Sequence, residues 1–258
     1  ILDKKYEAQI PDSIVLNISK DKDFLSKPEL FMLDLLSGYQ WDRSLNLLSM
    51  GGDINIGIKE YLMHEGYSFK FVPIKNKTTT TEAGFVDTDE LYRKMSSVYK
   101  FDAISAGNFF IDYQNMYTNL GVLSVRSLFV TAAKAFVRAG EDARALEMLD
   151  KCSEVMKDYP LDSVPLGIAA NDYNVVDMVS LYLGLGEKEK ACKLAEDLAA
   201  ELLTSTTFYL RFYDWAPDEF QICGQYILLL CDELEKGGEK QLADSINESF
   251  NQILDSLS

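Results

Sequence analysis

Histidine and cysteine are scarce in this sequence, which limits the kinds of site it can form. One of the 258 residues is histidine and four are cysteine. The cysteines form no CxxC pair, and closely spaced pairs are what bring ligands within tetrahedral reach of zinc. We therefore expect no metal site. We interpret the cysteines as buried free thiols, with one disulfide as the alternative in an oxidising compartment; they are Cys152, Cys192, Cys223 and Cys231.

Basic residues and long apolar runs are also few. The chain has 25 Lys and Arg against 41 Asp and Glu, a formal charge of −16. Such a field repels phosphate backbones and anionic headgroups, so nucleic acid and bare membrane surfaces are poor partners. No window reaches the roughly 20 apolar residues of a membrane-spanning helix, and Ile1–Tyr6 is charged rather than signal-like. We expect a soluble piece of a longer precursor, which meets a membrane only through another part of that precursor.

The 47% of apolar residues is enough for a substantial core, in one large or two modest domains. The pattern changes along the chain and predicts three parts. Residues 1–100 read as a small α/β unit, residues 101–122 as an irregular bridge, and residues 123–258 as an all-helical domain.

The first hundred residues alternate between strand and helix patterns. Two capping boxes, Ser26 with Glu29 and Asp87 with Glu90, mark helix starts. Alternating strands and helices favour right-handed crossovers, so we expect a small parallel βαβαβ unit. The expected strands are Asp12–Ser19, Ser44–Ser49 and Ser68–Ile74, and the expected helices are Pro28–Tyr39, Ile54–Glu65 and Thr88–Tyr99.

The helical half contains three copies of a hairpin pattern centred on Gly140, Gly186 and Gly238. Phe136 and Tyr182 precede the first two glycines at the position where an aromatic fills the space between paired helices. The pattern is similar to tetratricopeptide repeats, so we expect antiparallel helical hairpins. The glycines are 46 and 52 residues apart, against a usual repeat of about 34. The extra residues are expected between hairpins, at Tyr159–Ala170 and Thr204–Pro217.

Stacked hairpins of this kind line a concave groove with their first helices. This groove is the best candidate binding surface in the sequence, for a protein or peptide or for a glycan. The alternative is that three irregular repeats leave the groove too short or too closed. The residues whose register faces the groove are Lys134, Arg138, Tyr173, Ser180, Gln225 and Asp232.

Patterns that could carry catalysis are weak. Gly51–Gly57 sits between a predicted strand and helix, but it is neither GxGxxG nor a P-loop, and Asp53 would repel a phosphate. His64 could be a general base, although we prefer a cation at a helix C-terminus. The acidic pairs Asp87/Asp89 and Asp218/Glu219 are interpreted as helix caps. We expect no catalytic residue and no cofactor.

Six aromatic residues surround Arg211 in Phe208–Phe220, FYLRFYDWAPDEF. Stacked aromatics can grip a peptide or a sugar ring. Aromatics at helical spacing more often fill a core, and a segment inserted between hairpins has to bury something to stay ordered. We therefore favour core packing for this segment.

Two motifs carry a resemblance to a known family: GIKEYLMHEGYSFKFVPIK at Gly57–Lys75 and VDTDELYRKM at Val86–Met95. With Val137–Met156 they resemble the soluble tail of the DUF2723 family, Bacteroidetes multi-pass membrane proteins that are similar to protein O-mannosyltransferases. The resemblance runs from about Trp41 to Met156 and more loosely to the C-terminus. It implies a periplasm-facing tail with tetratricopeptide-like helices, whose catalysis would lie in the membrane part.

These observations predict a non-catalytic interaction or scaffolding domain of a larger periplasm-facing membrane protein. The alternative is an accessory domain that binds a glycan or a lipid headgroup for a membrane glycosyltransferase. A third hypothesis, an independent small-molecule enzyme, would depend on the Gly51–Gly57 turn.

Overall fold

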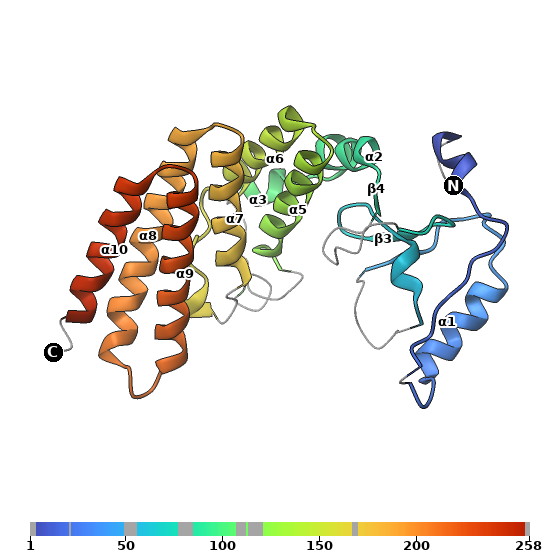
Figure 1. The fold of residues 1–258 in the computed structure, drawn as a ribbon, viewed down its shortest axis with the longest axis horizontal. Helices are drawn as coiled ribbons and strands as arrows, with labels where there is room; N and C mark the ends of the chain where they lie inside the picture. The colour runs from blue at the N-terminus through green and yellow to red at the C-terminus, as the bar shows by residue number, and fades with distance from the viewer. Residues whose placement is uncertain are drawn as a thin grey trace. The chain divides into compact units, whose positions relative to one another are not determined.

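The computed structural model of this chain separates it into two units, Ile1–Tyr99 and Lys100–Ser258, which we call the N-terminal unit and the helical unit (Figure 1). Each is described here by itself. The described residues are 4–20, 22–48, 56–76, 85–106, 112, 121–166 and 170–255.

The sheet of the N-terminal unit is mixed, so the prediction of a parallel βαβαβ unit is wrong. β3 runs antiparallel to both β1 and β2, and the short β4 runs parallel to β2. Only Glu65–Ser68 separates β2 from β3, and so short a link can join only antiparallel strands. In spatial order the strands are β1 (Asn46–Leu47), β3 (Phe69–Phe71), β2 (Leu62–His64) and β4 (Phe85–Val86).

Two predicted elements of this unit take other forms. The segment Asp12–Ser19, expected to be a strand, joins no ladder in the described part of the chain. It is held instead by Tyr61, whose hydroxyl accepts the Val15 N–H at 3.3 Å and donates to the Val15 carbonyl at 3.1 Å. The expected helix Ile54–Glu65 is, where described, a 3-10 turn (Ile58–Tyr61) followed directly by β2.

The first and the last of the three predicted helices of this unit are present. α1 (Lys27–Ser37) begins after Ser26, whose backbone N–H donates to the Glu29 carboxylate at 2.9 Å. α2 (Thr88–Arg93) continues into a π-helical turn (Lys94–Val98), and the Asp87 carboxylate caps it by accepting the Glu90 N–H at 3.3 Å. The core beneath the sheet is formed by Ile56, Ile58, Tyr61, Leu62 and Phe71.

In the helical unit each first helix of a hairpin packs against the helix that follows it and, in the first two hairpins, against the next but one. α5 packs against α6 and α7, α7 against α8 and α9, and α9 against α10 and α8. The first helices of successive hairpins therefore lie side by side (Figure 1). The expected helical hairpins agree with this arrangement, while their assignment as tetratricopeptide repeats stays a prediction. The helices are α5 (Ser124–Arg138), α6 (Asp142–Val155), α7 (Ala170–Gly184), α8 (Lys188–Arg211), α9 (Pro217–Lys236) and α10 (Lys240–Asp255).

The segment predicted as an irregular bridge, 101–122, contains a short helix, α3 (Asp102–Ala106), which packs against α6. Residues 107–111 and 113–120 of that segment lie outside the described residues.

The three turn glycines share one conformation. Gly140, Gly186 and Gly238 have φ of 74°, 84° and 86°, in the left-handed region that glycine adopts at least cost. In each turn the next residue donates its N–H to a carbonyl five positions earlier, at 2.9, 2.9 and 2.8 Å, which closes the helix end as a Schellman motif. Phe136 and Tyr182 are both buried. The predicted positions of Gly140 and Gly186 in turns between helices are confirmed.

Candidate functional site

The six residues predicted to line the groove lie on the first helices, but several are engaged in contacts within the fold. The Lys134 ammonium on α5 is 2.6 Å from the Asp177 carboxylate on α7 and lies 5.8 Å from the ring centre of Tyr173. The Ser180 hydroxyl donates to the Glu233 carboxylate of α9 at 2.5 Å. These contacts tie α5 to α7 and α7 to α9.

The remaining groove residues are exposed. Asp232 pairs with Lys236 one turn further along α9, at 2.6 Å. Arg138 lies at the end of α5, and Gln225 lies on α9. The structure thus brings Lys134 together with Tyr173, and it uses much of the polar chemistry of this face to join neighbouring helices.

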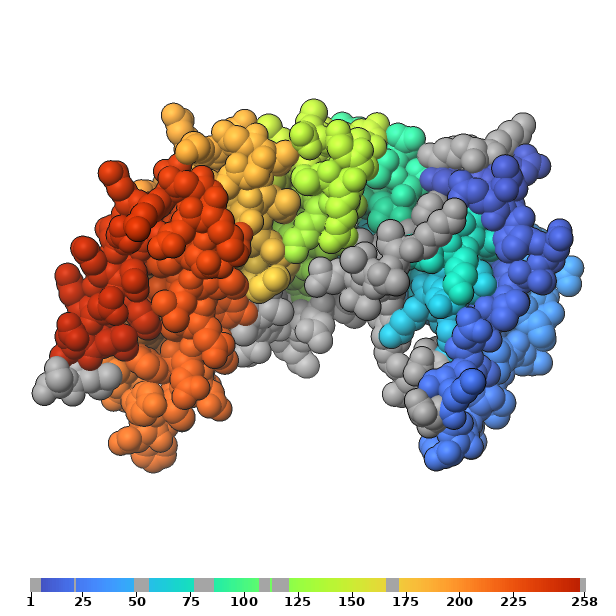
Figure 2. All heavy atoms as spheres, viewed as in Figure 1, coloured from blue at the N-terminus to red at the C-terminus, as the bar shows by residue number. Residues whose placement is uncertain are grey.

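The aromatic segment after α8 differs from its predicted core role. Phe208, Phe212, Tyr213 and Trp215 are exposed, Trp215 by 88%, whereas Tyr209 is buried. We call these four exposed side chains the aromatic surface. Phe208 and Phe212 are in contact, with ring centres 5.0 Å apart. Figure 2 shows the orange end of α8 and its turn into α9 projecting beyond the neighbouring helices of the unit.

Helix lengths explain this exposure. α8 has 24 residues and its hairpin partner α7 has 15. At 1.5 Å per residue, the last turns of α8 extend about 13 Å beyond what α7 can cover. α7 therefore does not reach the end of α8 that carries Phe208 and Phe212, although α9, with 20 residues, packs against α8.

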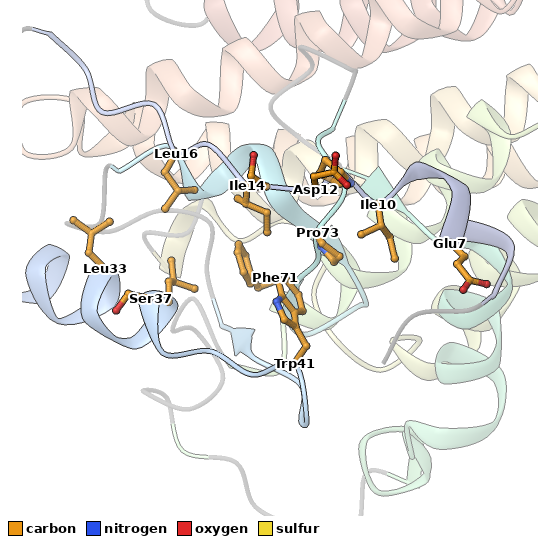
Figure 3. Close-up of a pocket in the computed structure, with 13 residues that line it drawn as sticks. Glu7, Ile10, Asp12, Ile14, Leu16, Leu33, Ser37, Trp41, Phe71 and Pro73 are labelled. Atoms are coloured by element: carbon orange, nitrogen blue, oxygen red, sulfur yellow. The ribbon is translucent and has the colours of Figure 1, made fainter.

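A cavity of about 840 Å³ lies in the N-terminal unit, between the extended segment after Ile10, helix α1 and strand β3. Figure 3 shows Trp41 and Phe71 beside each other at its centre, with Leu33 of α1 to one side and Ile10 to the other. The indole of Trp41 stacks on Phe71 with ring centres 5.3 Å apart and planes 17° from parallel. No pattern in the sequence indicates this cavity, because its walls come from segments distant along the chain.

Trp41 adopts an unusual backbone conformation. Its φ is 59°, a left-handed value that costs a non-glycine residue roughly 1–2 kcal/mol. The ring is held between Phe71 and Tyr39, whose centre is 4.6 Å away. Aromatic packing therefore stabilises a conformation that the local sequence disfavours, and such outliers often occur at binding sites.

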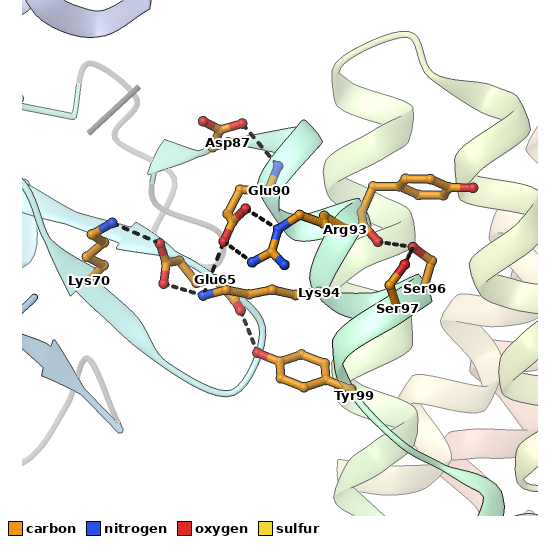
Figure 4. Close-up of polar contacts among 10 residues, drawn as sticks. Glu65, Lys70, Asp87, Glu90, Arg93, Lys94, Ser96, Ser97 and Tyr99 are labelled. Carbon is orange, nitrogen blue, oxygen red and sulfur yellow. Dashed lines mark hydrogen bonds and ion pairs between the residues drawn. The ribbon is translucent and has the colours of Figure 1, made fainter. Parts of the chain in front are cut away.

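Glu65, beside His64, organises the polar contacts of the N-terminal unit (Figure 4). Its buried carboxylate binds the ammonium of Lys94, and the ammonium of Lys70 is 3.6 Å away. The Tyr99 hydroxyl donates to the Glu65 carbonyl at 2.8 Å. These contacts join the β2–β3 turn to the end of the α2 segment, which is a structural role.

His64 lies on β2, so our interpretation of it as a cation at a helix C-terminus is wrong. It is buried, and its ring meets Phe69 edge-on with ring centres 5.0 Å apart. Burial lowers the pKa of His64 to about 4, so the imidazole is neutral at pH 7 and a weak base.

The other enzyme-like patterns are local features where they are described. Residues 51–55 of the Gly51–Gly57 turn lie outside the described residues. Gly57 has φ of 78°, and a Cβ there would be 2.7 Å from the Asn17 backbone, so a glycine is required at this approach. Asp218 and Glu219 lie in the first turn of α9, whose N-cap is Ala216, rather than at the cap itself.

Arg126 is a buried residue that sequence reasoning missed. It lines a cavity of about 670 Å³ among α6, α7 and α8. Its guanidinium donates to the carbonyls of Pro160 at 2.8 Å and Tyr159 at 3.1 Å. The signal was its place within the apolar run Val125–Val130. The arginine fixes the connector between the first two hairpins, which joins the end of α6 at Val155 to the start of α7 at Ala170.

Carboxylates hold the same connector from the other side. Glu201 of α8 accepts the N–H groups of Leu161 and Asp162 at 2.9 and 2.8 Å. Asp172 accepts both the N–H and the hydroxyl of Ser163, at 2.7 and 2.8 Å. Burial raises the pKa of Asp172 to about 7. The connector is thus anchored by buried polar groups.

Comparison with known proteins places one part of the chain. Residues 1–90 match the family model described as TMEM260-associated domain 2. The match spans the N-terminal unit up to the first turn of α2 and therefore includes the cavity beside Trp41. It covers about a third of the chain, 90 of 258 residues. No curated protein and no solved structure matches the chain.

Proposed function

We propose that this chain is a non-catalytic interaction module whose helical unit holds a protein partner through the aromatic surface. The observation that carries the proposal is the exposure of Trp215 by 88% in the same short segment as three further exposed aromatics. Monomeric proteins rarely expose contiguous apolar groups without a partner for them. Tryptophan and tyrosine are also the residues that most often dominate binding energy at protein interfaces.

Charge defines the partner further. Three acidic residues, Asp214, Asp218 and Glu219, adjoin the aromatic surface in sequence against one cation, Arg211, and the chain carries a net charge of −16. An apolar segment flanked by lysines or arginines would complement this surface, and complementary charge speeds association. An acidic partner would be repelled.

The chemistry of the described residues supports a role without catalysis. The single histidine is neutral and weakly basic, and burial raises the pKa of the Cys152 and Cys223 thiols to about 12, far from a reactive thiolate. Among the described residues, no group of His, Cys, Asp and Glu is arranged to hold a metal ion.

The proposal includes the setting that the DUF2723 resemblance implies, a periplasm-facing domain of a membrane protein. In the described part of the chain no helix is both long and apolar enough to cross a bilayer. The resemblance places membrane attachment in another part of the precursor, and we include this in the proposal. Carbonate extraction of membranes from the source cells, with detection of this chain, tests the setting, and release into the supernatant would contradict it.

A second candidate is an accessory glycan-binding domain. Trp215 and Tyr213 are exposed on either side of Asp214. Ring faces can stack on sugar rings while a carboxylate accepts hydrogen bonds from hydroxyls. The same surface would then serve a different ligand.

The test is to select binders from a random peptide library on the full chain and to measure their affinity for variants. We expect selected peptides to combine apolar and basic residues. Trp215→Ala should weaken them by about thirtyfold, the loss typical of a hot-spot residue. Phe24→Ala is the matched control, because Phe24 is 76% exposed in the N-terminal unit.

Two outcomes would redirect the proposal. Loss of binding with Tyr173→Ala but not with Trp215→Ala would assign the partner to the predicted groove instead. Binding to a glycan array that Trp215→Ala abolishes, without selection of any peptide, would favour the second candidate.

A further inference from the structure

The cavity beside Trp41 has the size and chemistry of a ligand site. Its volume of about 840 Å³ lies within the roughly 300–1,000 Å³ typical of small-molecule sites. Its walls are mostly aliphatic and aromatic, as such sites usually are. The residues that form the apolar wall are Ile10, Ile14, Leu16, Leu33, Leu36, Trp41 and Phe71.

The apolar side chains of the wall are only partly covered by the rest of the unit. Leu33 and Leu36 of α1 and the indole of Trp41 pack against the core and are only partly buried. Of the described residues of α1, only Glu29 is fully buried, and it pairs with Lys22 at 2.8 Å. Polar contacts therefore fix the start of α1, while its apolar side faces the cavity.

Trp41 is presented to this cavity at a cost to the backbone. Its left-handed φ of 59° is stabilised by the stack on Phe71 and the contact with Tyr39. A residue without a ring at position 41 would lose that stabilisation. The conformation places an indole at the centre of the wall, as Figure 3 shows.

The rim carries charge of one sign. Glu7 and Asp12 are exposed at the cavity edge with Ser13 and Ser37, and among the described lining residues none is basic. An anionic headgroup entering here would meet two carboxylates and no cation among the described lining residues. A positively charged end would be attracted by both.

We infer that this cavity binds an amphiphile with an apolar body and a cationic end, the body against Trp41 and the cation at Glu7 and Asp12. This site lies in the N-terminal unit and is independent of the aromatic surface, so the two proposals can fail separately.

The experiment uses the full chain carrying Trp215→Phe. The chain has two tryptophans, so this variant retains Trp41 alone. N-phenyl-1-naphthylamine, a neutral apolar fluorophore, is titrated while energy transfer from Trp41 is followed. Dodecyltrimethylammonium and dodecanoate, which pair apolar chains of similar length with opposite charges, then compete for the site below their micelle concentrations. We expect the cation to displace the probe at about tenfold lower concentration, since two exposed carboxylates each contribute modestly.

Two pairs of variants locate the binding. Ser37→Phe places a ring in the cavity and should abolish energy transfer, whereas Leu30→Phe on the exposed side of the same helix should not. Glu7→Lys with Asp12→Lys should reverse the preference for the cation. Asp23→Lys with Asp34→Lys makes the same change in net charge at exposed positions outside the lining and should leave it intact.

The inference is overturned if the probe does not bind, or if Ser37→Phe and Leu30→Phe behave alike. It is also overturned if dodecanoate competes as well as the cation, or if both lysine pairs change the preference equally. Circular dichroism of each variant shows whether the fold is retained.

Discussion

Removing the charge of Lys134 should destabilise the helical unit, whereas removing that of Arg138 should not. Both cations were expected to face the groove, where they either receive an acidic ligand or pair with acids of a neighbouring helix. The structure places the Lys134 ammonium 2.6 Å from the Asp177 carboxylate, on the neighbouring first helix. Arg138 lies exposed at the last turn of α5. The two residues therefore offer a matched pair of perturbations one helical turn apart.

The magnitude follows from their exposure. The side chains of Lys134 and Asp177 are 27% and 18% exposed, so solvent screens the pair only in part. A pair of this kind contributes about 0.5–1 kcal/mol, and the cation above the ring of Tyr173 adds about 0.5–1 kcal/mol. Lys134→Met keeps the aliphatic stem and should lower the free energy of unfolding by about 1–2 kcal/mol. Arg138→Met should change it by less than about 0.5 kcal/mol.

The assay is urea unfolding followed by far-UV circular dichroism, which reports mainly on the helical unit. A double-mutant cycle with Lys134→Met and Asp177→Asn isolates the interaction between the two side chains. We expect a coupling free energy of about 0.5–1 kcal/mol, which should shrink as salt is added because part of the pair is exposed.

A coupling below about 0.3 kcal/mol, within the error of such cycles, would refute this reasoning. Lys134 would then be free to serve a ligand, as the sequence suggested. Equal losses from Lys134→Met and Arg138→Met would also contradict it, because only Lys134 is paired with an acid of α7.

Three further predictions concern backbone conformation and buried titrating groups. Gly140→Ala should cost about 1–2 kcal/mol in urea unfolding because φ is 74°. Gly184→Ala, at the last residue of α7 with open space around it, should instead stabilise by up to about 1 kcal/mol. The pKa of His64 is about 4 in the folded state, below its usual 6.5, so the unfolded state binds the proton first. The free energy of unfolding should therefore fall by up to about 3 kcal/mol as pH drops from 6.5 to 4, and His64→Gln should remove this loss. Asp172 has a pKa of about 7 in the folded state, above its usual 3.8, so its protonated form favours the folded state. The free energy of unfolding should therefore fall by up to about 4 kcal/mol as pH rises from 4 to 7. Melting of Asp172→Asn, measured over the same pH range, should lack this fall. A wild type that matches either variant across its window would contradict the corresponding pKa.

Local chemistry was predictable from the sequence. The start of α1 at Ser26 and Glu29 and the hairpin turns at Gly140 and Gly186 follow from caps and left-handed glycines, which depend on a few adjacent residues. The sheet was not predictable in the same way. β2 was read as part of a helix because Ile58 and Leu62 are apolar at helical spacing, and its strand form depends on pairing with β3. A prediction without β2 also lacks the short link Glu65–Ser68, which is what requires β2 and β3 to be antiparallel.

The cavity and the aromatic surface were missed for geometric reasons. The cavity forms where residues as distant as Ile10, Leu36 and Phe71 meet, and periodicity within one segment carries no information about such a meeting. The exposure of Phe208 and Phe212 depends on the relative lengths of α7 and α8, and helix ends are the least reliable part of a prediction from sequence.

The extra residues between Gly140 and Gly186 and those between Gly186 and Gly238 have different structural roles. The difference supports a functional role for the second set. The residues added before Gly186 form a connector that Arg126 and Glu201 anchor through buried hydrogen bonds, so they are accounted for by stability. The residues added before Gly238 lengthen α8 and leave Trp215 exposed, an arrangement that gains little from burial. Exposed aromatics in a monomer carry a risk of aggregation without any benefit to folding. Their presence at the projecting end of α8 therefore supports the proposed protein partner.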